Sequence, residues 1–174
     1  VLADELLKLG AKKIEKHSRA VSFSGDKGFM YKANLCCRTA LKILKPIAVF
    51  RAENEKELYE EVQKINWSDY LSVDNTLAIE CSMNSELFNH TLYVSQKVKD
   101  SIVDQFREKY GKRPSVDIER PDLKINIHIY QNECTLSLDS SGESLYKRGY
   151  RDKTNIAPIN EVLAAGLVLL SGWD

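Results

Sequence analysis

Basic and aromatic side chains gather in one short segment near the carboxyl end of the sequence, residues 144–151. An arginine can bind a phosphate through two parallel hydrogen bonds, and a tyrosine ring can stack on an unpaired base. Gly149 would also let the backbone approach a partner closely. The composition indicates an RNA contact, although a surface strand or a domain hinge could share it. The candidate contact residues are Lys147, Arg148, Tyr150 and Arg151.

A second group of basic residues lies on an expected long helix and on the turn that follows it. Apolar residues recur every four positions from Val94 to Tyr110, which predicts a helix over about 92–110 that ends at Gly111. Lys99 falls on the apolar side of this helix, so its amine must extend to solvent or meet an anion. The candidate contact residues in this group are Lys97, Lys99, Lys112 and Arg113.

No set of side chains with catalytic spacing is visible. The turn at residues 25–28 lacks the spacing of a phosphate-binding loop, and no Gly-x-Ser-x-Gly elbow occurs. His128 lies within an alternating stretch, where a packed or edge side chain is expected rather than a base. The four cysteines form no Cys-x-x-Cys pair, which favours buried reduced thiols over zinc ligands. We therefore predict no catalytic residue, metal or cofactor in this chain.

The expected location is cytoplasmic, and no membrane contact is expected. Reduced thiols are typical of cytosolic proteins. No signal peptide is visible, and the longest apolar run, residues 162–170, is too short to cross a bilayer.

The formal net charge is +0, so any nucleic-acid surface must be a local patch. Residues 51–69 carry three bases and six acids, 3 − 6 = −3. Residues 97–113 carry six bases and three acids, 6 − 3 = +3, and residues 147–153 give 4 − 1 = +3. Ordinary solvated faces remain the alternative interpretation of this segregation.

Periodicity and turn residues predict a fold of the α+β or α/β class with a mixed sheet. Pro46 is expected to stop one of the helices. The last helix is apolar all round, and a helix of that kind is normally buried within a larger body. We therefore expect a further domain after it, and a segment before the first residues, which are already helical in period. The expected strands are 19–24, 47–50, 76–81, 123–130 and 134–138, and the expected helices are 29–44, 55–65, 92–110 and 158–170.

Several motifs, in order along the chain, resemble the amino-terminal part of the THUMP-containing large-subunit rRNA guanine-N2 methyltransferases. Such sequences are also often described as N6-adenine-specific DNA methylases. The matching segments are ELLKLGA (5–11), ANLCCRTA (33–40), INW (65–67), KVKDSIVD (97–104), RPSVD (113–117), LYKRGYR (145–151), APINEVLAA (157–165) and SGW (171–173).

The resemblance implies a THUMP domain with a mixed sheet, set within a small ferredoxin-like domain. It divides the chain into a ferredoxin-like region (1–28), the THUMP domain (29–140), a junction linker (141–157) and the first helix of a Rossmann-type methyltransferase domain (158–174). It also implies that this module presents 23S rRNA to a catalytic domain that uses S-adenosylmethionine and lies outside this chain. The family's glycine-rich cofactor loop and catalytic motif are not in this sequence.

Three alternatives stay open at this stage. The chain could belong to a THUMP-containing tRNA-modifying enzyme, or it could be an interaction domain that does not bind RNA. Arg148 and Arg151 could also pair with acids such as Glu143 or Asp152 while Tyr150 packs at a hinge. If the chain does bind RNA through these residues, we expect Lys112 and Arg113 to contribute mainly to RNA affinity. We expect Arg148 and Tyr150 to contribute mainly to the orientation of the RNA.

Overall fold

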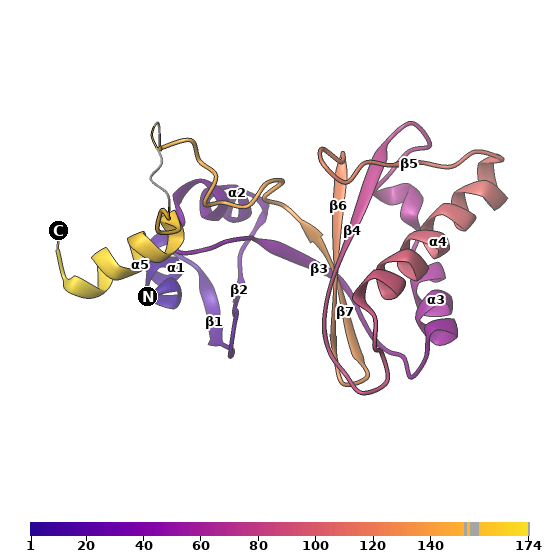
Figure 1. Cartoon of the computed structure of the whole chain (residues 1–174), viewed down its shortest axis with the longest axis horizontal. Coiled ribbons are helices and arrows are strands. Elements are labelled where there is room, and N and C mark those ends of the chain that lie inside the picture. Colours follow the sequence, from indigo (N-terminus) through magenta and orange to yellow (C-terminus); the bar gives the residue numbers. More distant parts are fainter. Residues whose placement is uncertain (152, 154–156, 174) are drawn as a thin grey trace. The chain divides into compact units, whose positions relative to one another are not determined.

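The computed structural model describes residues 1–151, 153 and 157–173, and the chain forms two compact units. The first unit contains Val1–Ile43 and Ser140–Asp174, and the second contains Leu44–Asp139 (Figure 1). The second unit is thus inserted into the first, as the family resemblance implies. Asp152, one of the acids considered as an arginine partner, lies outside the described residues.

The first unit is built around a short two-stranded sheet. Its elements are α1 (Leu2–Leu9), β1 (Lys12–Lys16), β2 (Val21–Ser24), α2 (Lys27–Cys36) and α5 (Glu161–Ser171). β1 and β2 pair antiparallel, with an irregularity between Lys12 and Glu15 where Lys13 takes a φ of 49°. A small core of buried residues holds the unit together: Leu6, Ala11, Ala33, Cys37, Ala40 and Ile43.

The segment after α2 is a loop and not the continued helix that we expected to reach residue 44. The carboxylate of Glu5 accepts hydrogen bonds from the backbone N–H groups of Arg38 (2.7 Å) and Thr39 (3.1 Å). It also accepts one from the hydroxyl of Thr39, at 2.6 Å. An acid on α1 therefore satisfies backbone donors that a continuous helix would use internally. α2 ends at Cys36, ten residues before Pro46.

The second unit contains a mixed five-stranded sheet with the order β3-β7-β6-β4-β5. β4 pairs parallel to β5 and β6, and the other pairs are antiparallel. Pro46 lies in the edge strand β3, beside a register shift, where a missing N–H is tolerated. The strands are β3 (Leu44–Arg51), β4 (Thr76–Asn84), β5 (Ser115–Val116), β6 (Leu123–Tyr130) and β7 (Glu133–Asp139).

Two helices cover one face of this sheet, α3 (Glu55–Gln63) and α4 (Thr91–Tyr110), with the short 3-10 turn η1 (Trp67–Asp69) beside them (Figure 1). The four-residue recurrence along α4 becomes a buried stripe in the core, and the helix packs against α3 and β4. Gln105 links the elements, because its side chain donates to the carbonyls of Gln63 (3.0 Å) and Ile65 (2.8 Å) and accepts from the backbone N–H of Trp67 (2.9 Å). The second unit therefore presents α4 on a rigid support.

Two further expectations differ from the structure. α5 begins at Glu161 and not at Pro158, because the side chain of Asn160 accepts from the N–H groups of Val162 (2.9 Å) and Leu163 (3.4 Å) and caps the helix there. Residues 29–43 belong with the first unit, so the expected division at residue 29 does not coincide with the boundary between the units.

Candidate nucleic-acid interface

The first candidate surface lies along the beginning of α4. The Lys97 amine stands over the ring of Tyr93, at 5.6 Å from its centroid. A shallow hollow there is lined by these two residues and by Glu55, Lys56 and Tyr59 of α3. A cation held over an aromatic face is pre-positioned to meet an anion at low cost in side-chain entropy.

Lys99 behaves differently from Lys97 although the two lie on the same helix. Its amine forms an ion pair with Asp100 at 2.5 Å, and the Lys99 side chain is only 28% exposed. The sequence had predicted that this amine would reach solvent or meet an anion, and the structure gives it an anion from its own helix. A phosphate would have to compete with Asp100 for this amine.

The second candidate surface lies where α4 ends. Gly111 takes a φ of 67° and closes the helix, and Lys112 and Arg113 follow it as exposed side chains. No acid lies within ion-pair distance of either of them in the described part of the chain. Lys109 is a third basic residue at this position, and it was not among the candidates predicted from the sequence. Its amine donates a hydrogen bond to the hydroxyl of Ser68 at 3.0 Å.

Tyr110 belongs to the same corner of the second unit. Its phenol oxygen lies 3.2 Å from the hydroxyl of Ser68, and hydrogen bonding with Ser68 and Lys109 favours the phenolate and lowers the pKa of Tyr110. The Lys109 amine stands 5.3 Å from the ring centroid. The ring is half-exposed and lies beside Phe106. Lys97 is separated from this corner by about 21 Å of helix, since an α-helix rises 1.5 Å per residue. The structure therefore places the first group of candidates at two separate positions.

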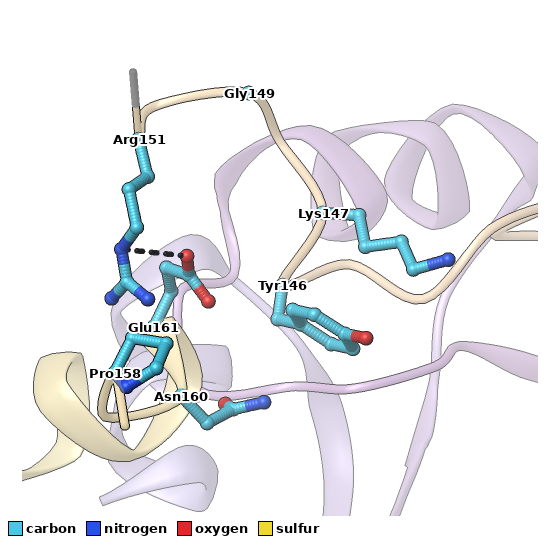
Figure 2. Close-up of a pocket in the computed structure, with 7 residues that line it drawn as sticks. All are labelled: Tyr146, Lys147, Gly149, Arg151, Pro158, Asn160 and Glu161. Atoms are coloured by element: carbon cyan, nitrogen blue, oxygen red, sulfur yellow. Dashed lines mark ion pairs between the residues drawn. The ribbon is translucent and has the colours of Figure 1, made fainter. Parts of the chain in front are cut away.

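The third candidate surface is an open hollow of about 510 Å³ in the first unit. Figure 2 shows the Arg151 side chain reaching toward Glu161, another residue that lines this hollow. Arg151 Nε lies 3.4 Å from the carboxylate of Glu161, and its guanidinium also donates to the carbonyl of Ile159 at 2.7 Å. The hollow is lined by Tyr146, Lys147, Gly149, Arg151, Pro158, Asn160 and Glu161.

Arg148 has a structural role that its sequence context did not suggest. Its guanidinium donates to the carbonyls of Asn34 (2.8 Å), Leu35 (2.7 Å) and Cys37 (2.7 Å) at the end of α2. Its Nε also donates to the carbonyl of Leu145 at 3.0 Å. These carbonyls are among those that a helix leaves without an internal partner. Arg148 therefore joins the junction to α2, and its donors face the fold.

Lys147 and Tyr150 are the junction candidates that remain available to a partner. Lys147 is exposed, and Tyr150 is 77% exposed, so Tyr150 does not pack at a hinge. Of the two arginines, Arg151 does form an ion pair with an acid, but the acid is Glu161 and not Glu143, one of the partners considered from the sequence. Arg148 binds backbone carbonyls instead.

The described part of the chain contains no group of three side chains that could hold a metal ion. None of its helices is long and apolar enough to cross a membrane. His128 is exposed on β6, with Nδ1 3.0 Å from the hydroxyl of Ser82.

Three of the thiols, two of them buried and one partly buried, are poor nucleophiles. Burial raises the pKa of Cys37, Cys81 and Cys134 to about 11. Because only the thiolate reacts, we expect these three to be alkylated at pH 8 about 100-fold more slowly than the same residues in urea-unfolded chain. The reaction should accelerate as the pH rises toward 11. Mass spectrometry of iodoacetamide-treated protein measures this, and equal rates in folded and unfolded chain would contradict it.

Comparison with known protein families gives two matches that follow one another along the chain. The THUMP domain model matches residues 52–139, and the RlmL ferredoxin-like domain model matches residues 1–44. These ranges correspond closely to the inserted second unit and to the beginning of the first. The chain belongs to the THUMP domain family, joined to an RlmL-type ferredoxin-like domain.

The most informative relatives are methyltransferases. The chain is 42% identical, over 99% of its length, to ribosomal RNA large subunit methyltransferase K/L of Syntrophotalea carbinolica, of which it covers 24%. The corresponding enzyme of Magnetococcus marinus is 41% identical over the same share of the chain. The matched part is the amino-terminal part of these proteins.

A solved structure agrees with this assignment. A Listeria monocytogenes protein described as a predicted N6-adenine-specific DNA methylase superposes with a TM-score of 0.84 at 31% identity, over 99% of this chain and 45% of that one. The chain therefore spans from about a quarter to about half the length of the relatives it matches. Its fold and family are those implied by the sequence motifs.

Proposed function

We propose that this chain is the RNA-binding module of an rRNA methyltransferase, and that it presents large-subunit rRNA to a catalytic domain. The observation that supports it most is the corner at the end of α4, where Lys112 and Arg113 project from a rigid helix without an acid partner. This corner lies in the THUMP domain, and the relatives that match the whole chain are named as ribosomal RNA methyltransferases.

S-adenosylmethionine is the methyl donor proposed for the whole protein, because a methyltransferase structure similar to this chain was solved in complex with SAH. The residues of this chain do not fit that cofactor. A dinucleotide-type cofactor site needs a glycine-rich turn between a parallel strand and a helix. Here the parallel strand β4 is joined to α4 by residues 85–90, SELFNH, which contain no glycine. The cofactor is therefore proposed to bind outside the described residues.

The helix α5 supports the proposal of a neighbouring catalytic domain. Leu163, Leu167 and Leu170 are 57%, 53% and 71% exposed, so this apolar helix has little of its surface covered by the first unit. Apolar surface of this extent normally packs against a partner. We propose that α5 packs within the methyltransferase domain, that 23S rRNA is the substrate, and that the methyl group is transferred to guanine N2.

The corner at the end of α4 provides the direct test. Replacing Lys112 and Arg113 with alanine should weaken binding to a large-subunit rRNA transcript and lower the log–log salt slope by roughly 1.8, since each phosphate contact to a helical segment contributes about 0.9. The measurement is RNA binding by the chain over a series of salt concentrations. The double variant Lys45→Ala/Lys64→Ala removes the same net charge elsewhere in the second unit and serves as the control.

The outcomes separate the open alternatives. Equal losses in the two variants would show that only net charge matters, and the proposed corner would be wrong. Stronger binding to a tRNA than to the rRNA transcript would favour a tRNA-modifying enzyme. No binding to either RNA would favour an interaction domain of another kind.

A further inference from the structure

The charge of the chain divides between the two units. The first unit, Val1–Ile43 with Ser140–Asp174, contains 13 Lys or Arg and 8 Asp or Glu, so 13 − 8 = +5. The second unit, Leu44–Asp139, contains 12 and 17, so 12 − 17 = −5. The net charge of zero thus conceals a basic unit and an acidic unit. A polyanion is attracted by the first unit as a whole, and by the second only at local patches.

The basic charge of the first unit is concentrated on the β1–β2 hairpin. Residues 12–19 carry four bases and one acid, 4 − 1 = +3, as large an excess as in either segment singled out from the sequence. The four bases are all exposed, and no ion pair or side-chain hydrogen bond engages them in the described part of the chain. Lys16 does lie close enough to Asp4 to help lower the pKa of that carboxyl, but Asp4 pairs with the chain's amino group. The bases are Lys12, Lys13, Lys16 and Arg19.

The hairpin is held against the core by apolar side chains, while its four basic residues stay exposed. Ile14, Val21 and Phe23 pack against the core of the first unit, and the ring of Phe23 meets Phe29 edge-on at 5.6 Å. The imidazole of His17 lies 3.0 Å from the hydroxyl of Ser22, which joins the two strands near their turn. Apolar residues therefore anchor the hairpin to the core, and the lysines remain exposed, Lys12 paired with Ser24 and Lys16 paired with Val21.

We propose that the β1–β2 hairpin is a second RNA-binding element, and that it contacts the phosphates of a helical RNA segment. This inference rests on the proposed function, because it names a further surface for the same RNA. The hairpin exposes no phenylalanine, tyrosine or tryptophan ring on which a base could stack, and the imidazole of His17 is held by the hydroxyl of Ser22, so phosphates are the main groups that its side chains can bind. Lys12 and Lys16 lie about 13 Å apart along a strand, a span that covers several phosphates of one RNA strand. Helical RNA is recognised mainly through its backbone, which suits a basic ribbon.

The test is the double variant Lys12→Gln/Lys16→Gln, which leaves Lys13 and its positive φ untouched. Binding of the chain to a short RNA duplex of mixed sequence should weaken by up to about 60-fold at 0.1 M salt, and the salt slope should fall by roughly 1.8. The control Lys45→Gln/Lys64→Gln removes the same charge from the second unit. Far-UV circular dichroism and thermal unfolding establish that both variants remain folded.

The variant Glu15→Gln tests the same surface in the opposite direction. It removes the single acid of the hairpin and should strengthen binding to the duplex. If the Lys12/Lys16 variant binds the duplex no more weakly than the control does, the hairpin is not a contact element. That result, together with a loss of binding on replacing Lys112 and Arg113, would leave the proposed function standing. If the unmodified chain binds no RNA at all, the proposed function fails and this inference fails with it.

Discussion

Replacing Arg148 with alanine is expected to lower the stability of the first unit by roughly 2–4 kcal/mol. The guanidinium donates to the carbonyls of Asn34, Leu35 and Cys37, and the variant would leave these acceptors at the end of α2 without a partner. It would also remove a positive charge from the carboxyl end of a helix, where the dipole favours cations. Hydrogen exchange of the α2 amides measures the loss, and these amides should exchange much faster than in the unmodified chain.

Arg148→Lys is the matched control for this prediction. It keeps the charge but cannot reproduce the planar fork of donors, so it should recover only part of the stability. If the α2 amides of Arg148→Ala are protected as well as in the unmodified chain, the hydrogen bonds contribute little. If RNA affinity falls while protection is unchanged, Arg148 serves RNA and not the fold, as the sequence had predicted.

Replacing Trp67 with alanine is expected to lower the free energy of unfolding of the second unit by roughly 3–5 kcal/mol. The side chain is fully buried in the core that supports α4, and its Nε1 donates to the carbonyl of Val62 at 3.0 Å. The cavity left by the indole would lie where the end of α3 meets α4. Urea unfolding followed by far-UV circular dichroism gives the free energy directly.

Trp67→Phe is the milder variant at this position. It keeps the six-membered ring but loses the pyrrole part of the indole and the hydrogen bond to Val62, so a smaller cost of about 1–3 kcal/mol is expected. A cost below about 1 kcal/mol for Trp67→Ala would show that the site collapses around the missing ring. RNA binding by either variant should recover under conditions where the second unit is folded, because Trp67 contacts no candidate RNA residue.

The elements that the sequence predicted well are those with a strong apolar period. The limits of α4 were predicted to within a residue, because its buried positions recur every turn from Val94 to Phe106. β6 was predicted over its full length because its isoleucines alternate with polar residues. β1 was missed, because Lys12–Lys16 carries one partly buried apolar side chain among charged ones. Its strand conformation depends on pairing with β2 and on Ile14 reaching the core.

The candidate site was harder to predict than the fold, because segments rich in lysine and arginine look the same in a sequence whether their side chains bind RNA or bind the fold itself. Arg148 was predicted to contact RNA, yet three of its four acceptors lie 111 to 114 residues earlier in the chain. No local pattern could have indicated carbonyls at that distance. For the lysines of the hairpin the excess of positive charge was visible in the sequence, but no strand was predicted over Lys12–Lys16. Lys112 and Arg113 were predicted as exposed bases, and they are exposed because Gly111 ends the helix just before them.

The insertion of one unit into the other has a consequence for how the protein is made. Leu44 and Asp139 are paired neighbours in the sheet, so the inserted unit begins and ends at one place, and its 139 − 44 + 1 = 96 residues need no other part of the chain to complete their sheet. During synthesis these residues leave the ribosome before Arg148 does, while α2 still lacks the side chain that joins its last turn to the junction. Domains generally fold as they emerge. The order of folding is therefore reversed relative to the order of synthesis: the unit translated first, around α1 and α2, is the one completed last.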